Sequence, residues 1–254
     1  MTIFLSTDIF HGQLQPIRSG RQLFGKITFP LGLVESRVGA NGEWNRVSLN
    51  QEMFVGEFLK TGPKSRAEIT LRGGGKFRIG ELTELELTKA KVDGLKKDFG
   101  ATVSRGQVWV AAKAAFGETK NVSVKTPTAV AAIRGTTYRA VADTAVSSIL
   151  LYEGEVDVIW ADVAQDVIDG QQGGSGPPGG GFSIGPPEEV GAPQEVPGPF
   201  EVSLEDWIRL VQGMQINVRS DGKYSMFEFD QTSDAELEFV KWNMERDSTD
   251  AATP

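Results

Sequence analysis

The sequence predicts an all-β protein. Between residues 25 and 160, short segments that alternate apolar and polar side chains recur roughly every 8–15 residues. Glycine-rich turns separate these segments, and no long helical pattern lies between them. Strands that follow one another without intervening helices are typical of all-β folds rather than α/β folds.

A weak internal similarity bears on how the strands are arranged. Residues 106–110 resemble residues 154–158, and residues 61–69 resemble residues 126–133. Because the spacing is irregular, this similarity favours stacked β-coils, a solenoid-like arrangement, or two related β-layers over a regular solenoid with one fixed period.

The expected regions follow in order along the chain. Residues 1–25 form a lead-in segment, and residues 26–169 form the β domain, in which Asn41-Gly42 is typical of a tight hairpin turn. Residues 170–199 contain ten glycines and seven prolines, a composition that predicts a flexible and separable linker or long loop. Residues 200–254 form a small C-terminal segment that is expected to pack on the β domain.

The C-terminal segment contains three expected elements. Residues 200–211 are ambiguous, although Ser203 and Asp206 resemble a capping box and the apolar residues that follow have helical spacing. Residues 215–229 are typical of a hairpin. A last helix, capped by Ser233 and Glu236, is expected to dock on the body through its apolar side chains, and residues 249–254 are expected to fray.

Composition narrows the classes of function. The chain has no cysteine and one histidine, His11, which leaves almost no side chains for thiolate metal sites, cysteine nucleophiles or catalytic triads. No apolar run is long enough for a membrane-spanning helix. We therefore expect a non-enzymatic protein with no catalytic, cofactor-binding or metal-binding residues.

Three weaker patterns have ordinary structural interpretations. Residues 20–26 match the start of a phosphate-binding loop, but Ile27 replaces the hydroxyl residue that ligates magnesium. Glu84 and Glu86 share one face of an expected strand, where a solvated surface is a better interpretation than an acid–base pair. The basic residues are not interleaved with aromatic ones and belong to no recognisable module, so no nucleic-acid partner is expected.

Several blocks, taken in order, resemble the FecR domain family. The blocks are Gly56, Thr61, Gly62 and Ser65; Gly106 and Val108; Thr126 and Pro127; Arg134, Gly135 and Thr136; and Gly154. The resemblance covers about residues 25–160 well and residues 200–247 loosely. Most of these residues are expected to be structural, since glycine permits backbone conformations that other residues avoid.

The resemblance implies a solenoid-like all-β domain in the bacterial periplasm or outside the cell, where it acts as a binding or signal-sensing module. Family members with the full architecture pass a signal from an outer-membrane transporter to an extracytoplasmic sigma factor. The helical anti-sigma region and the transmembrane helix of those members have no counterpart in this sequence. A structural subunit of an envelope or extracellular assembly is the alternative function.

A basic stripe is the candidate binding site. Strand alternation around an expected three-residue turn at residues 73–75 places four basic side chains on the outer face, with Arg72 opposite Lys76. The stripe consists of Arg66, Arg72, Lys76 and Arg78. Glu68 is the only acid in residues 60–78, so local charge compensation is expected to be thin.

The stripe has two open interpretations. It is either a solvated basic face or a site for an anion. Residues 1–160 carry a net charge of +5, whereas residues 161–254 carry −13. The candidate anions are therefore the chain's own acidic tail and an acidic protein or glycan partner.

Overall fold

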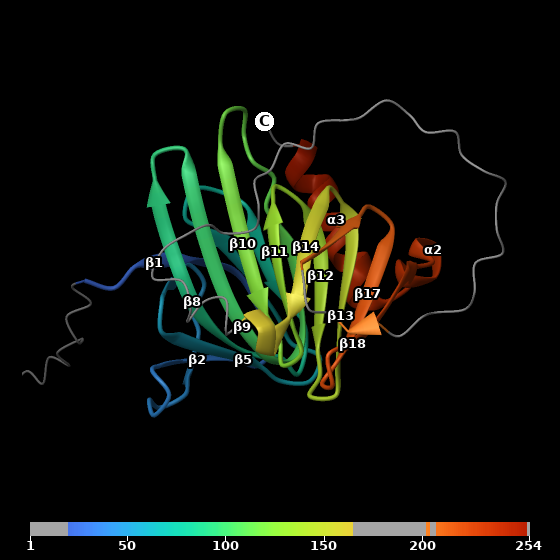
Figure 1. Cartoon of the computed structure of the whole chain (residues 1–254). Helices are drawn as coiled ribbons and strands as arrows, with labels where there is room; N and C mark the ends of the chain where they lie inside the picture. The colour runs from blue at the N-terminus through green and yellow to red at the C-terminus, as the bar shows by residue number, and fades with distance from the viewer. Residues whose placement is uncertain (1–19, 165–201, 204–206, 253–254) are drawn as a thin grey trace, which may run out of the picture.

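A computed structural model describes residues 20–164, 202–203 and 207–252, and confirms that the protein is mostly β (Figure 1). The first strand begins at Leu23, three residues before the expected start of the β domain. The expected linker at residues 170–199 and the candidate residue His11 lie outside the described residues.

The strands form two layers, sheet A and sheet B, which share the long strand β9. Sheet A contains, in spatial order, β4 (Glu52–Phe54), β1 (Leu23–Leu31), β6 (Arg66–Leu71), β7 (Lys76–Ile79), β9 (Lys96–Ala111), β12 (Thr137–Ala142), β13 (Val146–Glu153), β17 (Met214–Arg219), β18 (Lys223–Glu228) and β15 (Val202–Ser203). Sheet B contains β3 (Asn45–Arg46), β2 (Val34–Val38), β5 (Glu57–Thr61), β8 (Glu84–Asp93), β9, β10 (Thr119–Lys125), β11 (Ala129–Arg134), β14 (Glu155–Trp160) and β16 (Ile208–Val211).

The strand β9 passes from one sheet to the other at Gly106. Residues 96–105 pair with β8, and residues 106–111 pair with β12. Gly106 has φ +88°, and a Cβ atom there would lie 2.3 Å from Oγ1 and 2.5 Å from Cα of Thr83. Only glycine combines this backbone conformation with so close an approach.

A single apolar core fills the space between the sheets. Phe24 and Phe77 of sheet A meet Phe99 of sheet B, with ring centroids of Phe24 6.0 Å and 5.5 Å from those of Phe77 and Phe99. All three side chains are buried. Among the described strand pairs only β9–β10 is parallel, so the solenoid-like character remains a prediction while the two-layer arrangement is observed.

The C-terminal segment adds strands to both layers and a helix to the outside of sheet A. The expected hairpin is present as β17 and β18, and β17 pairs with β13. The helical spacing in residues 200–211 was misleading, because residues 208–211 form β16 at the edge of sheet B, where backbone pairing with β14 decides the conformation. No helix in the described part of the chain has the length and hydrophobicity needed to cross a membrane.

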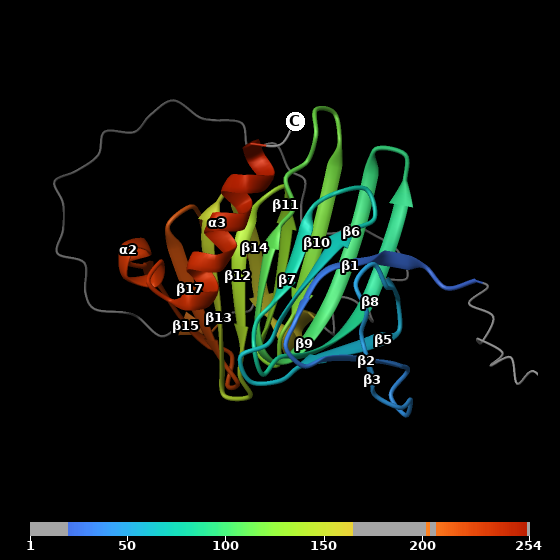
Figure 2. The ribbon, with the colours of Figure 1, turned by 180° about the vertical axis from the view of Figure 1, so that it is seen from behind.

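Two helices follow the hairpin. Ser233, which was expected to cap the last helix, lies inside the short helix α2 (Gln231–Asp234), and the last helix begins only at Glu238. The cap of α2 is Asp230, whose side chain accepts hydrogen bonds from the backbone N–H groups of Thr232 and Ser233. The longer α3 (Glu238–Ala252) lies across the outer face of sheet A, as Figure 2 shows. It stays helical to Ala252, so most of the expected fraying at residues 249–254 is not observed.

Candidate functional site

The contact between α3 and sheet A is built around a buried group of charges, which we call the helix–sheet ion cluster. Sheet A contributes Glu68 and Arg78, and α3 contributes Arg246, Asp247 and Asp250. Arg78 Nε donates to Glu68 Oε2 at 2.7 Å, and Arg246 Nε donates to the same oxygen at 2.9 Å. Arg78 also donates from Nη1 to Asp247 and from Nη2 to Asp250 at 2.9 Å. Each side of the interface thus supplies both an acid and a base to the other.

Glu68 is the centre of this cluster. Its side chain is 1% exposed and also accepts hydrogen bonds from Thr28 at 2.7 Å and from Lys76 at 3.3 Å. Burial by itself raises the pKa of Glu68, but the hydrogen bonds from Arg246, Arg78 and Thr28 outweigh it and lower the pKa from 4.5 to about 2. The expectation of thin charge compensation was therefore wrong, because this one carboxylate contacts three cations.

The structure corrects the expected exposure of the basic stripe. Strand alternation does place Arg66, Lys76 and Arg78 on the outer face of sheet A, but α3 covers this face, and Arg78 is 0% exposed. Arg66 donates to Glu238 of α3 at 2.7 Å. A sequence pattern identifies the outer face of a sheet but does not reveal which distant element packs on it.

The turn between β6 and β7 is also wider than expected. Lys76 lies opposite Thr70 and not opposite Arg72. The three glycines at positions 73–75 have φ between +88° and +94°, a region that favours glycine, and they carry the chain out of the ladder before β7 begins. Arg72 is consequently exposed in the turn, away from the other three basic side chains.

Aromatic side chains surround the ion cluster on both sides of the interface. Trp109 of β9 donates its indole N–H to Asp247 at 2.9 Å and packs on Tyr152 of β13, with ring centroids 4.4 Å apart. From α3, Phe239 is buried and Trp242 packs against Phe29 of β1 at 5.5 Å. Apolar packing therefore positions the helix, and the buried charges fix its register.

A second ionic contact holds α2. Asp234 accepts hydrogen bonds from Arg139 of β12 and from the hydroxyl of Tyr152, and Arg139 Nε also donates to that hydroxyl at 3.1 Å. Burial is the largest cause of a pKa of Tyr152 well above its usual range. The phenol therefore stays protonated and donates a hydrogen bond to Asp234.

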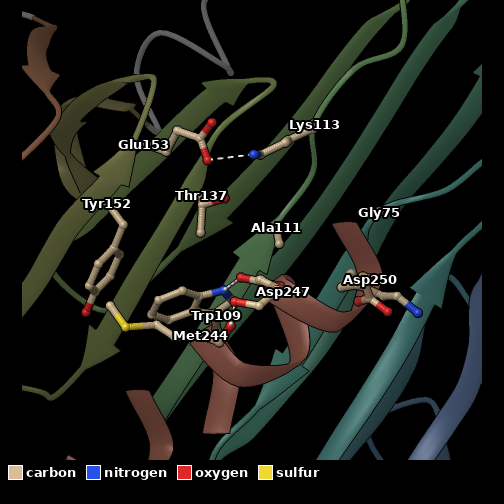
Figure 3. Close-up of a pocket in the computed structure, with 12 residues that line it drawn as sticks. Gly75, Trp109, Ala111, Lys113, Thr137, Tyr152, Glu153, Met244, Asp247 and Asp250 are labelled. Atoms are coloured by element: carbon tan, nitrogen blue, oxygen red, sulfur yellow. Dashed lines mark hydrogen bonds and ion pairs between the residues drawn. The ribbon is translucent and has the colours of Figure 1, made fainter. Parts of the chain in front are cut away.

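A pocket of about 450 Å³ opens beside α3, over β9, β12 and β13 (Figure 3). Trp109, Tyr152 and Met244 form an apolar wall, and Asp247 borders it from the helix. At the rim, Lys113 and Glu153 form an ion pair of 2.8 Å. The pocket shows that α3 leaves part of the outer face of sheet A uncovered.

Several of the residues that carry the family resemblance lie where the chain crosses between the sheets. Gly106 is the crossing within β9, and Gly154 (φ +89°) links β13 to β14, where a Cβ atom would lie 2.4 Å from Cγ2 of Thr136. The hydroxyl of Thr61 donates a hydrogen bond of 2.6 Å to the carbonyl of Gly80, next to the point where the chain passes from β5 in sheet B to β6 in sheet A.

The remaining family positions occupy turns and the core. Gly56 lies in the turn between β4 and β5, and Gly135 lies between β11 and β12. Thr126 and Pro127 form the turn between β10 and β11, and Val108 is buried in the core. Gly62 directly follows Thr61, and the hydroxyl of Ser65 accepts a hydrogen bond from the backbone N–H of Leu33. The side chain of Arg134 is outside the described part of the structure.

The other candidates do not gather at a common site. Glu84 pairs at 3.6 Å with the exposed Arg105, and residues 20–26 lead into β1. Asp247 and Asp250 complete the helix–sheet ion cluster, but no local sequence motif marks them as site residues. Their one sequence signal is the negative charge of the C-terminal region opposite a basic stripe.

Fold and site together define a two-layer β domain in which a charged helix of the same chain covers part of the outer face of one sheet. Residues 57–157 match the family model described as "FecR protein". The resemblance to the FecR family is thus confirmed over these residues. No curated protein matches the sequence.

Two solved structures match part of this chain. Both are described as a "putative anti-sigma factor from Parabacteroides distasonis ATCC 8503", at 1.65 Å and 2.50 Å resolution. Each has a TM-score of 0.45 and 14% sequence identity, and the match covers 71% of this chain and 64% of that chain. The chain therefore spans just under two thirds of the length of these structures.

Proposed function

We propose that this protein is a non-enzymatic, signal-sensing binding module of FecR type in the periplasm or outside the bacterial cell, and that the face under α3 is its protein-binding surface. The partner presents a helix that carries acidic and aromatic side chains in the manner of α3. In the free protein α3 occupies this surface, and the partner replaces it.

The observation that carries this proposal is the chemistry of the helix–sheet ion cluster. Arg78 is fully buried on the outer face of a sheet, where, within the described part of the chain, its charge is paired with Glu68 and with the two carboxylates of α3. A helix with an arginine followed by two acids, at the spacing of Arg246, Asp247 and Asp250, satisfies both Glu68 and Arg78. Such a surface recognises a helix by charge placement as well as by shape.

A labelled peptide with the sequence of residues 236–252 tests whether the surface accepts a helix from another molecule. The tethered α3 acts at an effective concentration of the order of millimolar, so the peptide competes poorly against it in the wild type. The double variant Asp247→Asn/Asp250→Asn weakens the tethered copy. We expect this full-length variant to bind the unmodified peptide at least about tenfold more tightly than the wild type does, since charge-assisted hydrogen bonds favour the intact peptide.

Glu245→Gln is the matched control, because Glu245 lies on the exposed side of α3. This variant is expected to bind the peptide as the wild type does. A peptide that itself carries both asparagines is expected to bind neither variant well. If the double variant does not bind the intact peptide, or binds both peptides equally, the face under α3 is not an exchangeable helix site.

A further inference from the structure

Three turns meet at one end of the molecule, beyond the ion cluster. They are the glycine turn at residues 72–75, the β8–β9 tip at residues 93–96 and the loop at residues 112–118 (Figure 1). The backbone N–H of Thr119 donates to the carbonyl of Leu95 at 2.9 Å, which joins the loop to the tip. Lys97 Nζ donates to the carbonyl of Gly73 at 2.7 Å, which joins the tip to the glycine turn.

A buried ion triad holds these turns in place. Glu118 pairs with Lys97 and, at 3.6 Å, with Lys120, and the three side chains are at most 16% exposed. Glu118 also accepts a hydrogen bond at 3.0 Å from the backbone N–H of Ala115, within its own loop. Hydrogen bonds, first from Lys97 and then from the backbone of Ala115, lower the pKa of Glu118 to about 2, so this carboxylate is ionised at neutral pH. Burial lowers the pKa of Lys120, and the charge of Glu118 opposes that shift. The three turns therefore form one fixed platform.

The platform presents large apolar side chains to solvent. Phe116 is fully exposed at the end of its loop, and Leu95 is 66% exposed at the neighbouring tip. Ala114 and Ala115 beside them are also exposed. Exposed apolar side chains are ordinary when scattered singly, whereas those that gather at one place on an ordered surface mark an interaction site. Phe116 and Leu95 lie on two turns that a backbone hydrogen bond joins, which favours the second interpretation.

Basic side chains surround the two apolar tips. Arg72, Lys96 and Lys113 are exposed at the three turns, and Lys97 and Lys120 outnumber Glu118 in the triad, which formally adds one positive charge. Among the described residues, the exposed acids nearby are Asp93, Glu153 and Asp250, of which Glu153 pairs with Lys113 and Asp250 with Arg78. The end of the molecule is therefore locally positive although the whole chain carries a net charge of −8.

We propose that this platform, the membrane-contact tip, binds the surface of a bilayer that contains anionic phospholipids. Phe116 and Leu95 enter the interfacial region, and the surrounding cations contact lipid phosphates. Apolar insertion combined with basic residues is how peripheral proteins attach to anionic membranes. A bilayer suits the tip better than a protein does, since two protruding side chains offer far less than the roughly 800 Å² that each partner buries in a stable protein interface.

The absence of cysteine in the sequence makes the test simple, because one introduced cysteine can be labelled without background. Phe116→Cys and Leu95→Cys, labelled with an environment-sensitive fluorophore, are mixed with phosphatidylglycerol vesicles or with neutral phosphatidylcholine vesicles. We expect emission at both positions to rise at least about twofold with the anionic vesicles and much less with the neutral ones. Leu49→Cys is the matched control, since Leu49 is 59% exposed away from the tip, and its label should not respond.

Sedimentation of unlabelled protein with the same vesicles measures the contribution of each part. The double variant Phe116→Ser/Leu95→Ser should lower the partition coefficient at least about tenfold, and Leu49→Ser should leave it unchanged. Lys96→Gln should lower it about fivefold, with a loss that diminishes at high salt. The proposal is overturned if the wild type does not sediment with anionic vesicles, or if the double serine variant sediments as well as the wild type. Neither result bears on the site under α3, which these variants do not touch.

Discussion

Replacing Glu68 by glutamine removes the charge on which the helix–sheet ion cluster depends while it keeps the shape of the side chain. In the folded protein this carboxylate receives hydrogen bonds from Arg78, Arg246, Lys76 and Thr28. The amide of glutamine offers one acceptor oxygen in place of two, and its NH₂ group faces cations. We therefore expect Glu68→Gln to destabilise the protein and to loosen α3.

The size of the effect follows from the pKa of Glu68. The fall from 4.5 to about 2 corresponds to about 3 kcal/mol, at ~1.4 kcal/mol for each pKa unit. Removal of one partner of a buried ion pair typically costs about 3–5 kcal/mol, which agrees with this figure. For a chain of this size, a loss of about 3 kcal/mol lowers the melting temperature by about 6–12 °C.

Thermal unfolding of wild type and Glu68→Gln at several pH values measures this loss. Because the pKa of Glu68 is lowered in the folded state, its stabilisation is complete above about pH 5 and disappears as the pH falls towards 2. The difference between the two proteins should therefore be largest at neutral pH and should shrink in acid. Glu84→Gln is the control, since Glu84 pairs at the surface and should cost at most about 1 kcal/mol. A loss below about 1 kcal/mol for Glu68→Gln, or one that does not change with pH, would refute the reasoning.

Three further substitutions test other parts of the structure. Gly106→Ala should lower the free energy of unfolding in urea by at least about 2 kcal/mol, because its Cβ would clash with Thr83. Gly94→Ala, which has open space around it, should lower it by about 1 kcal/mol. Equal losses would contradict the conclusion that β9 needs glycine where it passes between the sheets. Trp109→Phe should cost about 1.5–3 kcal/mol in the same assay, since Asp247 loses a charge-assisted hydrogen bond, and no loss would contradict that bond. Tyr152→Phe should cost about 1–3 kcal/mol and speed proteolysis around α2, and unchanged cleavage would show that the hydrogen bond from Tyr152 to Asp234 does not anchor the helix there.

Many of the strands and their buried faces could be predicted from the sequence, because the alternation of apolar and polar side chains is a local property. The inward side chains Ala67, Ile69 and Phe77 are buried as the pattern of residues 66–80 predicts. The Thr-Gly and Arg-Gly-Thr blocks likewise indicated the family whose model matches residues 57–157. These signals depend on spacing within short segments.

The helix–sheet ion cluster could not be predicted in the same way. Arg78 and Asp247 are separated by 169 residues, and neither residue belongs to a local pattern that names its partner. The opposite charges of the body and the C-terminal region indicated that such contacts were available, but not which helix face would dock or where. The β16 strand was missed for a related reason: apolar residues at helical spacing also fit a short edge strand when a neighbour such as β14 supplies backbone partners.

Amide hydrogen exchange of the wild-type protein tests most directly whether α3 can leave the sheet while the domain stays folded. If α3 is an exchangeable cover, the amides of residues 240–250 should exchange through a local opening whose free energy lies well below that of the central strand β9. Addition of a protein or peptide that binds the face under α3 should then speed their exchange while β9 stays protected. If α3 and β9 exchange only together, through global unfolding, then α3 is a fixed part of the fold and the proposed binding surface is never exposed.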